Sequence, residues 1–170
     1  MSQTSESGRT LPPYIGELRR AVEEAAPKLL RMSDAKAKRR PRPEKWSPAE
    51  IIGHLIDSAS NNHQRFVRAQ FQDDLVFPGY DQDAWVVVQA YGDASWVDLV
   101  TLWKNFNFHI ARVMEKTPDS VRNSARVKHN LDKLAWRPVP ADQPATLDYF
   151  MSDYIGHLKH HLGQIDYAAS

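Results

Sequence analysis

Apolar side chains recur every three or four positions in four long stretches of this chain, which is the spacing of one face of an α-helix. The stretches cover about residues 12–32, 47–72, 95–117 and 146–165. No segment shows the alternation of apolar and polar side chains that is typical of a half-buried strand. The pattern therefore predicts four long amphipathic helices and no strand.

Local start signals support three of these helices. In the segment WSPAEI, Ser47 is placed as the N-cap and Glu50 as the third helical residue, which together predict a capping box. Ser95 with Asp98 gives a second N-terminal signal, and Thr146 a third. These signals predict where three of the four long helices begin.

The connections differ in length and composition. Residues 33–45 are polar and contain two prolines, so they predict a plain connection. After the second long helix, the loop FPGYDQDAW precedes a short helix predicted over residues 82–89. Residues 119–145 predict a long connection with one short element. In a compact domain, a connection of that length is either functional or a topological crossover.

These elements predict an all-α fold, a four-helix bundle with at least one long crossover connection. Residues 1–10 are polar and predict a disordered tail. Residues 11–170 then form a single domain, which is the simplest organisation for a chain of 170 residues.

Composition narrows the classes of function. The formal net charge is +1 and there is no basic stripe, which argues against a nucleic-acid partner. No stretch approaches the roughly 20 apolar residues of a membrane span, and the N-terminus has no apolar signal core, so we expect a cytoplasmic location. The chain has no cysteine, so a metal ion would be held by His, Asp, Glu, carbonyl groups or water.

Three of the seven histidines lie in the segment HLKHH near the C-terminus. His157 and His161 are four residues apart, so they share one face of the predicted last helix. His160 lies about 100° away around the same helix and is expected at the rim. The pair can hold one metal ion, but a polar patch near a chain end has the same spacing, and the pair lacks the glutamate of HExxH.

His54 lies on the second predicted helix between apolar neighbours, so it is either a boundary histidine or a third ligand. Bundles build metal sites from side chains on facing helices. Three neutral imidazoles from His54, His157 and His161 would suit Zn, Ni or Fe and leave a coordination position open.

Other polar residues are candidates for catalytic roles. Asp57 and Asn61 continue the polar stripe that begins at His54, and they can position a substrate or move protons. His109, beside an apolar position of the third helix, is either an extra ligand or general base inside the bundle, or a histidine at the edge of the core. Asp153, one turn before His157, either orients a ligand imidazole or is a solvated carboxylate.

Three segments carry a resemblance to a known family. They are WSPAEIIGHLIDSASNNHQRF, PGYDQDAWV, and DYIGHLKHHLGQID with its HxxxH spacing. Together they resemble the DinB-like superfamily of metal-binding four-helix bundles, also called the YfiT/DinB family. The resemblance implies an up-down-down-up bundle, a divalent metal (often Zn or Ni) held by His54, His157 and His161, and a homodimer.

The resemblance also implies a range of activities, since members include metal-dependent hydrolases, S-transferases that use low-molecular-weight thiols such as bacillithiol or mycothiol, and an isomerase. One hypothesis is therefore an enzyme with a small-molecule substrate that enters beside Tyr80, Asp81 and Asp83. The alternative is a non-enzymatic module that binds a metal or ligand, in a stress response or as a dimeric interaction domain. An open cleft over the histidines would favour the enzyme.

Overall fold

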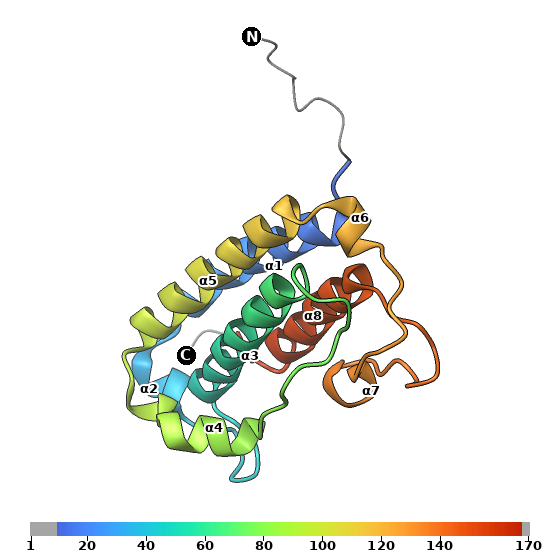
Figure 1. Ribbon diagram of the computed structural model, residues 1–170. Helices are drawn as coiled ribbons and strands as arrows, with labels where there is room; N and C mark the ends of the chain where they lie inside the picture. The colour runs from blue at the N-terminus through green and yellow to red at the C-terminus, as the bar shows by residue number, and fades with distance from the viewer. Residues whose placement is uncertain (1–9, 168–170) are drawn as a thin grey trace.

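The computed structural model describes residues 10–167, and in that range the chain is a helical bundle without strands, as predicted (Figure 1). Residues 1–9 of the predicted tail lie outside the described part. The four long helices are α1 (Pro13–Leu30), α3 (Pro48–Arg68), α5 (Trp96–Lys116) and α8 (Leu147–Leu162). The shorter elements are α2 (Asp34–Lys38), α4 (Gln82–Gln89), the 3₁₀ turn η1 (Tyr91–Asp93), α6 (Asp119–Arg122) and α7 (Leu131–Leu134).

The predicted boundaries hold best where a cap is present. The Ser47 side chain accepts a hydrogen bond from the Glu50 backbone N–H, and the Glu50 side chain accepts one from the Ser47 backbone N–H, so the capping box is confirmed. Ser95 and Thr146 cap α5 and α8 as predicted. The C-terminal ends were predicted too late, since α3 ends four residues before position 72 and α8 three residues before position 165.

The bundle has the up-down-down-up order. The Trp96 indole N–H at the start of α5 donates to the Leu29 carbonyl oxygen at the end of α1 over 2.8 Å, so these two helices are antiparallel. Helices α3 and α5 run side by side in the same direction (Figure 1), with the rings of His63 and His109 in contact. Helix α8 runs opposite to α3, which brings the end of α8 beside the beginning of α3.

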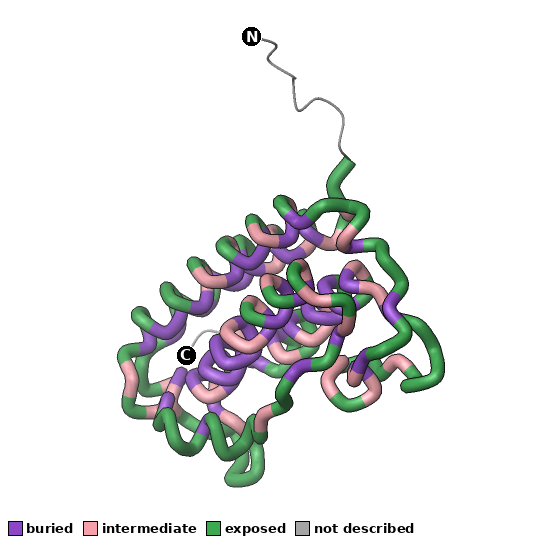
Figure 2. The backbone as a smooth tube through the Cα atoms, in the orientation of Figure 1, coloured by how far each residue is buried: buried purple, intermediate pink, exposed green. Residues whose placement is uncertain are grey.

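Buried residues, coloured purple in Figure 2, recur along the four long helices. The largest fully buried side chains include Trp103, Phe66 and Leu18, contributed by three different helices. Burial of this apolar surface is the main favourable contribution to folding. No helix in residues 10–167 has the length and apolar character needed to cross a membrane.

The connections hold more structure than the sequence predicts. Residues 33–45 contain the short helix α2, and residues 119–145 contain two short helices instead of one. The α3–α4 and α5–α8 connections also meet, because the Leu75 N–H donates to the Lys128 carbonyl oxygen over 3.0 Å. His129 in the α5–α8 connection is buried, and its Nε2 lies 2.6 Å from the Gln143 carbonyl oxygen.

Candidate metal centre

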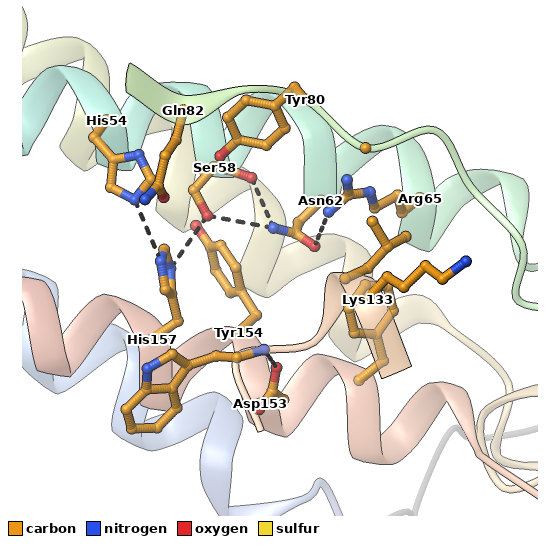
Figure 3. Close-up of a pocket in the computed structure, with 14 residues that line it drawn as sticks. His54, Ser58, Asn62, Arg65, Tyr80, Gln82, Lys133, Asp153, Tyr154 and His157 are labelled. Carbon is orange, nitrogen blue, oxygen red and sulfur yellow. Dashed lines mark hydrogen bonds between the residues drawn. The ribbon is translucent and has the colours of Figure 1, made fainter. Parts of the chain in front are cut away.

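Three histidines from two helices converge at one end of the bundle. His54 from α3 meets His157 and His161 from α8, and one ring nitrogen of each lies within 4.8 Å of the others. The Nε2 atoms of His54 and His157 are 3.3 Å apart and face each other (Figure 3). Nitrogen ligands at about 2.0–2.1 Å from a tetrahedral ion lie roughly 3.3 Å from each other. The arrangement therefore fits a metal ion after small side-chain adjustments.

Local structure explains why these side chains meet. His157 and His161 stand one turn apart on α8, on the side that packs against α3. His54 lies near the capped start of α3, and the antiparallel packing of α3 and α8 brings it opposite that pair. His54 is only 1% exposed, whereas His157 and His161 are half-buried.

Hydrogen bonds at the Nδ1 atoms orient two of the rings. His161 Nδ1 lies 3.0 Å from Gln164 Oε1, and this oxygen can only accept, so Nδ1 carries the proton and Nε2 keeps its lone pair. His157 Nδ1 lies 3.4 Å from Ser58 Oγ. Such outer hydrogen bonds fix the tautomer of metal-binding histidines. His54 Nδ1 is buried and has no hydrogen-bond partner among the described residues.

The three imidazoles are neutral at pH 7. Burial, with a smaller effect of His161, lowers the pKa of His54 to about 4. Burial and the neighbouring histidines lower the pKa of His157 to about 3, and burial also lowers the pKa of His161. A metal ion needs the unprotonated imidazole. The group therefore presents three neutral nitrogen donors and no carboxylate, a donor set suited to Zn, Ni or Fe.

An indole ring covers the group on one side. The Trp46 ring centroid lies 5.0 Å from that of His54 and 6.3 Å from that of His161. Trp46 directly precedes the Ser47 cap, so the turn that starts α3 also holds the indole in place. We did not anticipate this contact, because the sequence does not show that Trp46 and His161 are neighbours.

His54 and His157 line a pocket of about 300 Å³, whereas His161 does not line it. Figure 3 shows His54 and His157 at one end of this pocket. Its walls come from α3, α8 and both long connections, with polar groups from Ser58, Asn62 and Tyr80. Burial raises the pKa of Tyr80 to about 12, so its hydroxyl stays neutral. The combination of nitrogen donors with an adjoining cleft is typical of a catalytic metal site.

Asp153 has a role that differs from both expectations for it. It is buried, and its carboxylate accepts hydrogen bonds from the backbone N–H groups of Trp136 over 2.7 Å and Arg137 over 2.9 Å. It therefore ties the α5–α8 connection to α8 instead of orienting an imidazole. The Trp136 indole then lies directly over Gly156, where a Cβ atom would be only 2.8 Å from the ring.

Asp57 and Asn61 do not line the pocket, so its geometry gives no support to the expectation that they act on a substrate. Asp57 is buried and accepts hydrogen bonds from the Tyr91 hydroxyl over 2.6 Å and the Gln89 amide over 2.7 Å. The Asn61 amide donates to the Asp57 carbonyl oxygen of its own helix. Ser58 and Asn62, each one position further along, line the pocket instead. One residue changes the direction of a helical side chain by about 100°.

The other candidates occupy three different places. His109 is exposed on α5, contacts His63 and does not line the pocket, which favours the alternative of a histidine at the edge of the core. His160 is exposed, as expected for a rim position. In the loop before α4, Tyr80 lines the pocket, while Asp81 caps the helix by accepting from the Ala84 N–H.

An up-down-down-up bundle with three converging histidines beside a pocket defines a class of helical proteins equipped to bind a metal. The sequence profile of the DinB superfamily matches residues 17–165, and the chain belongs to this superfamily. This confirms the resemblance carried by the three segments.

Two solved structures are similar in fold, each with a TM-score of 0.69. One is YfiT from Bacillus subtilis, described as a probable metal-dependent hydrolase with an unusual four-helix bundle topology. It is 18% identical, and the match covers 96% of this chain and 89% of YfiT. The other is a mycothiol-dependent maleylpyruvate isomerase, 9% identical, matched over 99% of this chain and 65% of the isomerase. No curated protein sequence matches this chain significantly.

Proposed function

We propose that this protein is a metal-dependent enzyme that acts on a small molecule, with His54, His157 and His161 as the metal ligands. The observation that carries the proposal is that three neutral imidazoles converge and that two of them, His54 and His157, line the pocket. A structural metal site is closed, whereas this one adjoins a cavity of about 300 Å³. The donor set suits Zn, Ni or Fe. The description of YfiT as a probable metal-dependent hydrolase supports the same class of function.

The surrounding residues position the ligands. Gln164 and Ser58 orient the rings of His161 and His157 through their Nδ1 atoms. Trp46 packs against the rings of His54 and His161. A divalent ion in such a site lowers the pKa of a thiol or water that binds it and stabilises negative charge.

Of the two reaction types, the pocket favours thiol S-transfer over hydrolysis. Hydrolysis benefits from a carboxylate that accepts a proton from water. Among the described residues that line the pocket, the only carboxylate is Asp153, and both of its oxygen atoms accept backbone hydrogen bonds. A thiol needs no such base, because metal coordination is enough to deprotonate it. The chain has no cysteine, so the thiol would come from a low-molecular-weight co-substrate.

The mycothiol-dependent isomerase supports this preference, since a thiol co-substrate is used on a bundle of similar fold. In the proposed reaction, the thiol sulfur forms a bond to an electrophilic carbon of the substrate and the leaving group departs with the electron pair. The thiol proton passes to solvent. Neutral hydroxyl groups of Tyr80 and Ser58 are placed in the pocket to donate hydrogen bonds to the substrate.

The test is an activity screen of the metal-loaded protein. Low-molecular-weight thiols are assayed with a chlorinated electrophile, and hydrolysis of esters and amides is assayed in parallel. We expect thiol transfer that is lost in His157→Ala and kept in His160→Ala, because His160 is exposed and outside the converging group. Hydrolysis without thiol transfer would overturn the preferred reaction. Metal binding without either activity would favour the non-enzymatic binding module.

A further inference from the structure

The end of the pocket opposite the histidines carries two positive charges. Figure 3 shows Arg65 and Lys133 at that end, away from His54 and His157. Arg65 is on α3, eleven residues after His54, which corresponds to about 16 Å along the helix axis. Lys133 comes from α7 in the α5–α8 connection. Two separate segments therefore bring positive charges to the same end of the pocket (Figure 3).

Arg65 is buried without a negatively charged partner among the described residues. Only 6% of its surface is exposed. Its guanidinium donates to the Pro78 carbonyl oxygen over 2.9 Å and to Asn62 Oδ1 over 3.4 Å, and both acceptors are neutral. Burial lowers the pKa of Arg65, and the one ionisable group that opposes this shift is Tyr80, which is itself neutral. A buried charge without a counter-charge is costly to keep.

Two other buried arginines, Arg122 and Arg126, lie close to negatively charged carboxylates. Arg122 pairs with Asp119 over 2.7 Å and with Asp148 over 2.9 Å. Arg126 hydrogen-bonds to two carbonyl oxygens, and the negative charges of nearby Asp73 and Asp74 act on it. Neither arginine lines the pocket. The buried arginine that lines the pocket thus forms no ion pair with a carboxylate of the described residues.

Lys133 brings a second positive charge to the pocket. It is exposed, it lines the pocket, and it forms no ion pair among the described residues. The carboxylate in the pocket, Asp153, is occupied by two backbone N–H groups of the α5–α8 connection. Positive charge in a partly enclosed, low-dielectric cleft attracts anions and strengthens their hydrogen bonds.

We propose that Arg65 and Lys133 form a subsite for an anionic oxygen group, a carboxylate or a phosphate, of the small molecule that occupies this pocket. A guanidinium can bind such a group through two parallel hydrogen bonds, and the lysine ammonium adds a second charge from the opposite wall. The placement of the reacting end of that molecule at the histidines rests on the proposed function. The anion subsite itself rests only on Arg65, Lys133 and the pocket.

The test is isothermal titration of the purified protein with inorganic phosphate and with glutarate, with the neutral diamide of glutaric acid as the control ligand. We expect both anions to bind and the diamide not to bind. Arg65→Met should weaken anion binding about 10- to 100-fold, since it removes charged hydrogen bonds. Lys133→Met should weaken it about two- to fivefold, because this lysine is exposed. Arg65→Lys should recover part of the loss.

Two controls separate the possible explanations. Arg112→Met removes an exposed arginine of α5 outside the pocket, and it should leave anion binding unchanged. His157→Ala removes the proposed metal, so anion binding that survives there and fails in Arg65→Met belongs to the subsite. Binding lost in His157→Ala but kept in Arg65→Met would place the anion at the metal and overturn the inference. Equal binding of the diamide, or unchanged anion binding in both Arg65→Met and Lys133→Met, would overturn it too.

Melting curves of each variant show whether it is folded. If Arg65→Met fails to fold, Lys133→Met still decides, because its side chain lies outside the core. Anion binding that is equal in Lys133→Met and wild type would then contradict the subsite and leave Arg65 as a brace on the Pro78 carbonyl group. Metal content, measured on the same samples, reports on the histidine site independently of the anion result.

Discussion

Replacing Asp153 with alanine removes the carboxylate that ties the α5–α8 connection to α8. The side chain is 8% exposed, and it accepts the Trp136 and Arg137 backbone N–H groups over 2.7 and 2.9 Å. These hydrogen bonds hold the segment that carries Trp136, which forms part of the pocket wall. The variant should therefore loosen the wall while leaving the four long helices in place.

The magnitude follows from opposing contributions. A hydrogen bond to a charged group contributes about 1.5–3 kcal/mol, so two set an upper limit near 6 kcal/mol. Burial raises the pKa of Asp153 despite these hydrogen bonds, so desolvation of the carboxylate offsets much of this gain. Trp136 and Arg137 are exposed, so water can reach the freed N–H groups. We expect a loss of about 2 kcal/mol, which lowers the melting temperature of a chain of this size by about 4–8 °C.

The assay is thermal unfolding followed by circular dichroism, with metal content measured on the same samples. Asp142→Ala is the matched control, because Asp142 is exposed and lies in the same connection. It should melt within about 1 °C of wild type, as surface substitutions usually do. An Asp153→Ala protein that melts with the wild type would refute the anchoring role. Loss of bound metal in this variant would instead support the rejected idea that Asp153 orients a ligand histidine.

Three further predictions concern the metal and the pocket wall. Gln164→Ala should keep one metal per chain but bind it about 10- to 100-fold more weakly in chelator competition, because His161 Nδ1 loses its hydrogen-bond acceptor. Unchanged metal affinity would contradict the orienting role of Gln164. Gly156→Ala should displace the Trp136 indole, since a Cβ atom would lie 2.8 Å from the ring. Tryptophan fluorescence that is quenched more easily would show the displacement, and unchanged fluorescence would argue against it. Adding metal to chelator-treated protein at about 100 times its dissociation constant should add about 2.7 kcal/mol of stability, roughly 5–11 °C, and no shift would mean that the folded state does not bind it.

The helical fold could be predicted because its signals are local. Apolar spacing gives the long helices, and the Ser47 cap defines the start of α3 by hydrogen bonds within four residues. The helix ends were less certain, since α3 has no comparable stop signal and ends at Arg68 with an ordinary αR residue after it. Helix α2 was not predicted, because its five residues are too few to show a periodic pattern of apolar side chains.

The candidate site was only partly predictable. The four-residue spacing predicted that His157 and His161 share one face of α8. Which side of α3 faces α8 depends on tertiary packing, which the spacing does not show. Asp57, taken from the polar stripe, does not line the pocket, whereas the next residue, Ser58, does. Contacts over long sequence distances, such as Trp46 with His161 and Asp153 with Trp136, leave no periodic signal that one sequence can reveal.

The measurement that tests the account most directly is elemental analysis of the purified, untagged protein beside its histidine variants. The account predicts about one Zn, Ni or Fe per chain in the wild type. It predicts loss of this metal in His54→Ala, His157→Ala and His161→Ala with helicity retained, and no loss in His160→Ala. A wild type that takes up no metal even after reconstitution, or three variants that all keep it, would contradict the assignment and make the converging histidines a polar patch.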